Sequence, residues 1–320
     1  MPTLPAEVAA GFGLGRVAGC VAVAEGVMNL TWRLSTDLGT YAVKRLRDRP
    51  PGEVRTGLAL LPRLARRGFP VAVPCATGDG DTVLRAGEYW YAASGWLPGV
   101  HPRDLVFDLG ACAALGALVG RLHRALAEEC PPAPPTMPDI PDKADAARAD
   151  LARYEGRGAF GADEIAWRKR LLAEVADREP AAADVRPCGW THGDLQPYNL
   201  LVDPADGRLT GLLDWDRLGV RPYGLEVVRT ATIMFGTDLR RIAAFVRGYR
   251  ETVEITDSDL ADAAHRRWWT LATETWQLRR HYDSDDRSCD HLFVRRGAYL
   301  RWWTGHRAEL DAALTSGDTN

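Results

Sequence analysis

Lysine is scarce in this 320-residue sequence. Only three of its 40 basic residues are lysines, namely Lys44, Lys143 and Lys169, and the rest are arginines. This bias indicates a GC-rich coding sequence, in which arginine fills most positions that need only a positive charge. A lysine that persists against the bias is therefore a candidate for a specific chemical role.

Other shortages exclude whole classes of protein. The formal net charge of −3 lacks the basic excess of a general nucleic-acid binder. No apolar run is long enough to span a membrane, and the N-terminus lacks the basic start and apolar stretch of a signal peptide. Six scattered cysteines include no CxxC pair, which favours reduced thiols over a disulfide framework or a zinc site. We therefore expect a cytoplasmic protein that binds neither nucleic acid nor membrane, with its oligomeric state left open.

The pattern of secondary structure changes near residue 96. Before it, alternating and turn-bounded apolar runs predict strands over 21–23, 30–34, 41–46, 71–74 and 82–90. One helix is predicted over 53–67, although Gly57 and Pro62 weaken that pattern. After it, helical spacing predicts helices over 104–129, near 142–154 and 163–178, and from about 225 onward. We thus expect an α+β protein with a β-rich N-lobe, residues 1–95, and a mostly α-helical C-lobe, residues 96–320.

The most informative segment is WTHGDLQPYNLLV, residues 190–202. It has the skeleton H-x-D-x-x-x-x-N and runs directly into an apolar strand. Asp214 ends a second apolar strand, 15 residues after Asn199, and an Asp-Gly turn at 206–207 lies between the two strands. The strands therefore predict a hairpin that brings Asp194, Asn199 and Asp214 to one end.

Phosphoryl transfer needs such an arrangement, because its catalysis consists mostly of positioning and charge neutralisation. Asp194 is suited to orient an acceptor hydroxyl and take its proton. Asn199 and Asp214 offer hard oxygen ligands for Mg²⁺. His192 would brace the loop through hydrogen bonds. For Asp216 two interpretations stay open, assistance to a second metal ion or plain solvation.

Two upstream features fit the same chemistry. Lys44 shares a strand face with Ala42 and Leu46, because side chains alternate along a strand. An inward lysine is costly unless it is paired, and the phosphates of ATP with a helix glutamate would pair it. The segment EGVMN, residues 25–29, is the candidate phosphate loop, although its single glycine makes the signal weak on its own.

Taken together, these motifs resemble the aminoglycoside phosphotransferase family, the small-molecule kinases that also include choline kinases and one type of homoserine kinase. The resemblance spans roughly residues 20–230. It rests on three segments, which are His192–Leu195 with Asn199, Leu213–Trp215, and Tyr41–Lys44.

The resemblance implies a bilobal protein-kinase-like fold that binds ATP with Mg²⁺. It implies that backbone near Ser94 and Trp96 holds the adenine, and that Gly26 and Asn29 belong to the phosphate loop. It also implies a helix glutamate that pairs with the strand lysine. Glu53 is the only acid in the predicted helix, yet it lies about one turn earlier than the family pattern expects.

The expected function is ATP-dependent phosphorylation of a hydroxyl on a small molecule such as an antibiotic, a sugar or an amino alcohol. Two alternatives stay open. One is a kinase that modifies Ser or Thr of a precursor peptide in natural-product biosynthesis of the lanthipeptide type. The other is a pseudokinase that binds nucleotide without turnover, against which the complete set of Lys44, Asp194, Asn199 and Asp214 argues.

Overall fold

The chain forms two compact units. The structure, a computed structural model, describes residues 4–23, 30–47, 49–102, 107–135, 140–158, 160–180 and 187–315. The first unit consists of Met1–Ala111, Arg121–Ala133 and Trp190–Gly219, and the second of Cys112–Gly120, Pro134–Gly189 and Val220–Asn320. The motif-bearing segment around Asp194 therefore groups with the N-terminal residues. The lobe boundary between residues 95 and 96 stays a prediction.

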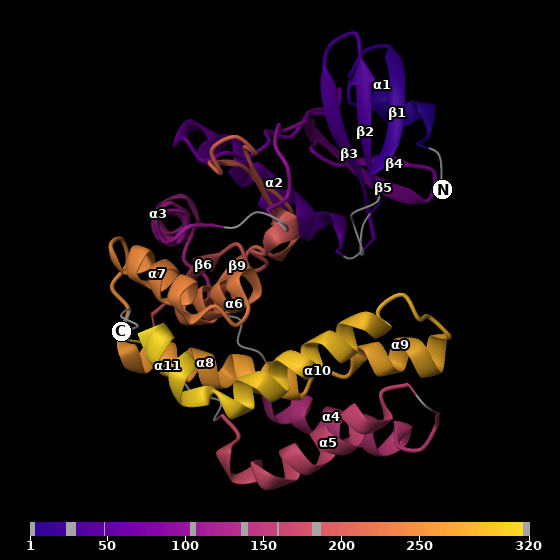
Figure 1. Cartoon of the computed structure of the whole chain (residues 1–320). Helices are drawn as coiled ribbons and strands as arrows, with labels where there is room; N and C mark the ends of the chain where they lie inside the picture. Colours follow the sequence, from indigo (N-terminus) through magenta and orange to yellow (C-terminus); the bar gives the residue numbers. More distant parts are fainter. Residues whose placement is uncertain are drawn as a thin grey trace. The chain divides into compact units, whose positions relative to one another are not determined.

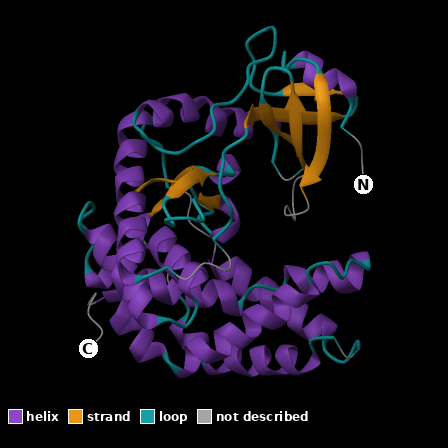
Figure 2. Ribbon diagram, turned by 45° about the horizontal axis from the view of Figure 1, so that its top comes forward, coloured by secondary structure: helices purple, strands orange, loops and turns teal. Residues whose placement is uncertain are grey.

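A five-stranded antiparallel sheet dominates the first unit (Figures 1 and 2). Its strands, in the spatial order β1-β2-β3-β5-β4, are β1 (Val17–Val23), β2 (Leu30–Thr36), β3 (Thr40–Leu46), β4 (Leu84–Ala86) and β5 (Tyr89–Gly95). The strands predicted over 21–23, 30–34 and 41–46 are confirmed. The single strand predicted over 82–90 is wrong, because Gly87, with a φ of 58°, turns the chain and makes a β4–β5 hairpin.

The two faces of this sheet pack against different helices. One face forms a hydrophobic core with α1 (Ala6–Gly11), and this core includes Val8, Phe12, Trp32, Val43 and Tyr91. On the other face, Leu46 and Ala92 pack with Val54 of α2 (Pro51–Arg66). Lys44 is opposite Ala92 in register and two residues from Leu46, so its side chain lies on the α2 face. The helix predicted over 53–67 is confirmed, and it runs through Pro62.

The predicted motif hairpin is present in the first unit. β7 (Leu200–Val202) and β8 (Leu209–Leu212) are antiparallel, with Leu200 opposite Leu212. The strand predicted over 71–74 is wrong as a sheet strand. It makes only isolated bridges, one from Val71 to Leu212 and one from Pro74 to Ser94. Prolines lack the N–H that a ladder needs, so this segment links the hairpin to β5 without becoming a strand.

The second unit is helical. Its helices are α4 (Ile140–Tyr154), α5 (Ala162–Glu174), α6 (Tyr223–Phe235), α7 (Leu239–Arg250), α8 (Asp257–Ala272), α9 (Trp276–Ser284), α10 (Asp290–Gly305) and α11 (Arg307–Thr315), together with the middle of α3 (Leu109–Glu129). Helices α6, α7, α8 and α11 pack together, and α4 lies beside α5 and α9 (Figure 1). The helical character predicted for these segments is confirmed. The long helix predicted over 104–129 begins later, at Leu109, because the Asp108 carboxylate accepts a hydrogen bond from the Ala111 N–H and caps it there. The predicted start at 104 lies outside the described residues.

Short elements connect the larger ones. β6 (Cys188–Thr191) and β9 (Gly219–Pro222) form a two-stranded sheet, and the 3₁₀ turns are η1 (Ala176–Arg178), η2 (Pro197–Asn199) and η3 (Trp215–Arg217). Within the described part of the chain, no helix has both the length and the apolar character needed to cross a membrane.

Candidate active site

The loop before β7 folds back on Asp194. The Asn199 N–H donates to the carbonyl oxygen of Gln196 at 2.9 Å, and this bond closes the η2 turn. The turn places Asn199 Nδ2 at 2.8 Å from the Asp194 carbonyl oxygen and 3.2 Å from its carboxylate Oδ2. Because the amide nitrogen faces Asp194, the amide oxygen of Asn199 points to the other side, where it can serve as a ligand.

His192 ties this loop to the end of the hairpin. Its ring is fully buried. The Asp194 N–H donates to His192 Nδ1 at 3.3 Å, so Nε2 carries the ring proton and donates to the Leu213 carbonyl oxygen at 3.0 Å. The Leu213 N–H in turn donates to the Asn199 carbonyl oxygen at 2.9 Å. His192 therefore fixes the backbone on both sides of the site, as a bracing residue should.

Asp214 adopts a backbone conformation that few residues other than glycine tolerate. Its φ of 62° and ψ of 72° lie in the left-handed region, which costs an ordinary residue about 1–3 kcal/mol. Such a conformation persists only where the surroundings enforce it. On one side Leu213 is held by two hydrogen bonds. On the other Trp215 is buried, with its ring 4.6 Å from that of His192.

Lys44 lies against two aspartates from the end of the hairpin. Its Nζ donates to Asp214 Oδ1 at 2.8 Å and to Asp216 Oδ2 at 2.6 Å. The Lys44 side chain is 21% exposed and that of Asp216 is 10% exposed. The residues meet across 170 and 172 positions of sequence, so tertiary folding of the first unit creates this cluster.

Burial and charge shift the titration of all three groups. Burial lowers the pKa of Lys44, but the charges of Asp214 and Asp216 and their hydrogen bonds outweigh it and raise that pKa overall. Burial likewise opposes ionisation of Asp214, yet Lys44 outweighs it and holds the Asp214 pKa below its usual range. For Asp216, burial raises the pKa by more than the charge of Lys44 lowers it. The negative charge of Asp214 raises it further, so the Asp216 pKa lies above its usual value. Lys44 is therefore a cation and Asp214 an anion at neutral pH.

The donor set of this cluster fits a hard divalent cation. The carboxylates of Asp214 and Asp216 present hard oxygen atoms beside Lys44. Mg²⁺ binds few protein oxygens at once, usually one or two carboxylates beside phosphate oxygens. Asp214 and the amide oxygen of Asn199 offer such a set. Among the residues that the structure describes, no group of three or more His, Cys, Asp and Glu side chains is placed to hold a metal ion.

The other sequence-predicted site residues have different surroundings. The carboxylate of Glu53 is half exposed and lies 3.2 Å from Arg49 Nη1, one turn earlier, whereas Lys44 bonds to the two aspartates. Ser94 is opposite Ala42 in the sheet. The Trp96 N–H donates to the Thr40 carbonyl oxygen at 2.9 Å, so both residues belong to the end of β5 and its exit. Gly26 and Asn29 lie outside the described residues.

Sequence reasoning missed three features of this site. Asp216 meets Lys44 directly, a contact that neither interpretation from the sequence includes. Gln196 donates a hydrogen bond to the Asp194 carboxylate. The sequence contains a signal for this contact, because side chains two residues apart in an extended segment point to the same side. Gly57 seemed only a weak point of the helix, but it lies against the backbone of Trp215.

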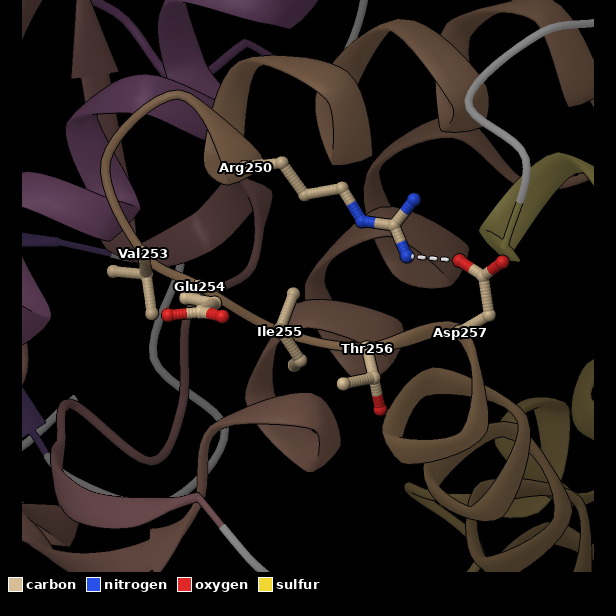
Figure 3. A pocket seen from close by; sticks show the side chains of 6 residues that line it. All are labelled: Arg250, Val253, Glu254, Ile255, Thr256 and Asp257. Carbon is tan, nitrogen blue, oxygen red and sulfur yellow. Dashed lines mark hydrogen bonds and ion pairs between the residues drawn. The ribbon is translucent and has the colours of Figure 1, made fainter.

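The second unit contains a pocket that is separate from the predicted site residues. It opens at the loop between α7 and α8 and is lined by Arg250 and residues 253–257 (Figure 3). Arg250 pairs with Asp257 across it. This pocket lies in the second unit and contains none of the predicted site residues.

Comparison with known proteins identifies the class of this chain. The model of the phosphotransferase enzyme family matches residues 19–257. The chain therefore belongs to this family, the aminoglycoside phosphotransferases and related small-molecule kinases, and it is an O-phosphotransferase. The resemblance noted from the motifs is confirmed.

Individual relatives agree with this assignment. The chain is 26% identical to a homoserine kinase of Granulibacter bethesdensis over 260 residues, which cover 78% of this chain and 77% of the relative. It is 32% identical to an aminoglycoside 3'-phosphotransferase of Streptomyces fradiae, over 52% of this chain and 60% of that enzyme.

The fold is shared with solved structures of the family. Spectinomycin phosphotransferase APH(9)-Ia, in complex with ADP and spectinomycin, has a TM-score of 0.65 at 12% identity and is covered over 98% of both chains. A microcompartment-associated aminopropanol kinase has a TM-score of 0.63 at 18% identity, over 92% of this chain and 94% of that one. The predicted protein-kinase-like fold, β-rich at the N-terminus and helical at the C-terminus, is confirmed.

Proposed function

We propose that this enzyme transfers the γ-phosphoryl group of ATP to a hydroxyl of a small molecule, with Mg²⁺ as cofactor. The observation that carries the proposal is the joint placement, within one unit, of Asp194 beside Asn199 and of Lys44 beside Asp214. Spectinomycin phosphotransferase, which shares the fold, is known in complexes with ADP and AMP, and this supports a nucleotide substrate. The six cysteines, all of which the structure describes, form no disulfide, and this supports the cytoplasmic location that we also propose.

Each residue has a defined task in this proposal. Asp194 accepts a hydrogen bond from the acceptor hydroxyl and orients it. It takes the hydroxyl proton as the hydroxyl oxygen bonds to the γ-phosphorus and the bond from that phosphorus to the bridging oxygen of ADP breaks. Lys44 holds the nucleotide phosphates with its compact ammonium group. His192 keeps the loop and the hairpin end in register. Mg²⁺ held by Asn199 and Asp214 would neutralise charge on the phosphates when bound.

The remaining nucleotide-binding residues belong to the same proposal. Gly26 and Asn29 would cover the phosphates, and the backbone at Ser94 and Trp96 would hold the adenine. Glu53 is proposed as the partner of Lys44 in the nucleotide-bound enzyme, although Arg49 binds its carboxylate in this structure.

Small molecules are the best-supported acceptors. The relatives named above are kinases or phosphotransferases whose names specify homoserine, an aminoglycoside, spectinomycin and aminopropanol. These relatives give no support to a peptide acceptor. Because they are named as kinases and phosphotransferases, they favour an active enzyme over a pseudokinase. We propose a hydroxylated amino acid or amino alcohol first, because homoserine kinases recur among the relatives.

An acceptor panel tests the proposal. The purified chain would be incubated with Mg²⁺ and ATP or GTP, and with L-homoserine, 1-amino-2-propanol, choline, spectinomycin or an aminoglycoside. We expect one acceptor to gain the mass of a phosphoryl group (PO3H) and an equal amount of nucleoside diphosphate to appear. Asp194→Asn should lower that rate by a factor of about 10² or more. An unchanged rate in this variant would remove Asp194 from its assigned role.

Binding measurements test the metal assignment separately. We expect Mg²⁺ to strengthen ADP binding to the wild-type chain and to have little effect on Asp214→Asn. Asp206→Asn, in the exposed turn of the same hairpin, is the matched control and should respond to Mg²⁺ as the wild type does. An equal Mg²⁺ response in Asp214→Asn would contradict the metal assignment.

A further inference from the structure

We propose that Gln196 is a positioning residue for Asp194, and this inference rests on the proposed function. Gln196 Nε2 donates to Asp194 Oδ2 at 3.1 Å. The same carboxylate oxygen accepts from Asn199 Nδ2 at 3.2 Å. Two N–H donors from different directions therefore meet on one oxygen of the proposed proton acceptor.

The local backbone explains why Gln196 can reach Asp194. Gln196 is extended, with φ −160° and ψ 166°, and side chains two residues apart in extended backbone point to the same side. Leu195 between them is 1% exposed, so burial of its side chain turns both polar neighbours the other way. The carbonyl oxygen of Gln196 also accepts the bond from Asn199 that closes the η2 turn. Gln196 is thus fixed by its backbone while its side chain folds onto Asp194.

The Gln196 donor can hold the Asp194 carboxylate in a way that Asn199 alone cannot. In the proposed mechanism Asn199 would give its amide oxygen to Mg²⁺, so its amide group would have a second task. Gln196 has no such second task and can hold the Asp194 carboxylate in place independently. Loss of Gln196 should therefore affect the rate of transfer and leave nucleotide binding intact.

Two variants of similar size separate the donor from the bulk of the side chain. Gln196→Met keeps the length and the neutral charge but removes the N–H donors, and Gln196→Lys restores a donor. With Mg²⁺–ATP and the acceptor identified by the panel, we expect Gln196→Met to lower kcat about 10- to 100-fold, since small misplacements of reacting groups have effects of that size. The KM for ATP should stay within about twofold of wild type, and Gln196→Lys should recover most of kcat.

Controls keep this inference distinct from the proposed function. Asp206→Asn changes an exposed residue in the turn of the neighbouring hairpin and should leave kcat and the melting temperature unchanged. If Gln196→Met retains wild-type kcat while Asp194→Asn abolishes transfer, the positioning role is overturned and the proposed function stands. If Gln196→Met lowers both kcat and the melting temperature, and Gln196→Lys restores neither, Gln196 is only structural and the inference is also overturned. If Asp194→Asn itself retains transfer, the proposed function fails.

Discussion

The carbonyl oxygen of Trp215 lies against the backbone of Gly57, so closely that a Cβ at position 57 would be 2.7 Å from it. Gly57 is in the second turn of α2, and Trp215 directly follows Asp214. A glycine in a helix costs about 0.5–1 kcal/mol relative to alanine, so its presence here needs a reason. The reason is contact: the missing side chain lets α2 approach the backbone that holds Asp214 in its left-handed conformation.

Gly57→Ala should therefore damage both stability and activity despite its better helix propensity. We expect a loss of about 1–3 kcal/mol in the free energy of unfolding, as for other overpacked sites. The rate should fall as well, because the backbone beside Asp214 must shift. Gly52→Ala is the matched control, since a Cβ at the first turn of the same helix meets nothing within 4 Å. Urea unfolding and initial rates measure both effects, and equal behaviour of the two variants would refute the contact argument.

Lys44→Arg should abolish most activity although it keeps the charge. Nζ of Lys44 reaches Asp214 and Asp216 in a half-buried space, at 2.8 and 2.6 Å, as a compact ammonium group. The wide planar guanidinium has a different donor geometry and cannot occupy the same position. Lys169→Arg, at a partly exposed surface pair with Glu155, is the control and should keep the wild-type rate. Initial rates at saturating ATP compare the two variants with wild type. A wild-type rate for Lys44→Arg would show that any cation at position 44 suffices.

Arg168 should be essential for the stability of the second unit. Its side chain is 1% exposed, and its Nε lies 2.6 Å from Glu164 Oε1. Its Nη1 donates to the carbonyl oxygens of Leu271 and Glu274 at 3.1 and 2.8 Å, which joins α5 to the α8–α9 connection. Arg301 Nη2 also lies 2.7 Å from Glu164 Oε2, so Glu164 keeps one cation when Arg168 is removed. The two carbonyl oxygens lose their buried donor, so Arg168→Met should cost about 1–3 kcal/mol.

Arg170→Met provides the comparison for this prediction. Arg170 is exposed on the same helix, and its loss should stay within about 0.5 kcal/mol. Urea unfolding followed by tryptophan fluorescence compares the two variants. Equal stability of the Arg168 and Arg170 variants would mean that the buried pair contributes nothing.

Tyr154 should make the protein sensitive to alkali. Its buried hydroxyl donates to Asp283 Oδ2 at 2.6 Å. Burial first, and then the hydrogen bond and charge of Asp283, raise the pKa of Tyr154 to about 12. A tyrosine whose pKa is higher in the folded than in the unfolded chain contributes stability below the unfolded value of about 10, and this contribution is lost as the pH rises toward 12.

The comparison of Tyr154→Phe with wild type isolates this effect. Between pH 10 and 12 the free energy of unfolding should fall less steeply in Tyr154→Phe, because phenylalanine has no proton to lose. Tyr89→Phe removes the hydroxyl of a residue that is 46% exposed and should keep the wild-type slope. Urea titrations at several pH values give the slopes, and parallel curves for all three proteins would exclude Tyr154 as the source.

Local patterns were sufficient for much of the fold and for the central motif. Alternation predicted β2 and β3, and the apolar runs on either side of an Asp-Gly turn predicted the β7–β8 hairpin, because both depend on neighbours in sequence. The apolar pattern over 82–90 predicted a single strand, and this was wrong, because the positive φ of Gly87 turns the chain and makes a hairpin. The strand prediction over 71–74 was also wrong, because prolines keep the segment out of the sheet ladder.

The sequence by itself determined the chemistry: a scarce lysine on a strand face, an H-x-D-x-x-x-x-N loop and an aspartate at the end of the next strand. Only the tertiary structure decided which side chains these residues contact. Lys44 meets Asp214 and Asp216 because the η3 turn after the hairpin packs against α2, and Gly57 permits their close approach. Distances of this kind depend on the packing of segments more than 100 residues apart. Spacing along the chain carries no information about them, which is why the pairing of Asp216 and the exposed position of Glu53 could not be predicted.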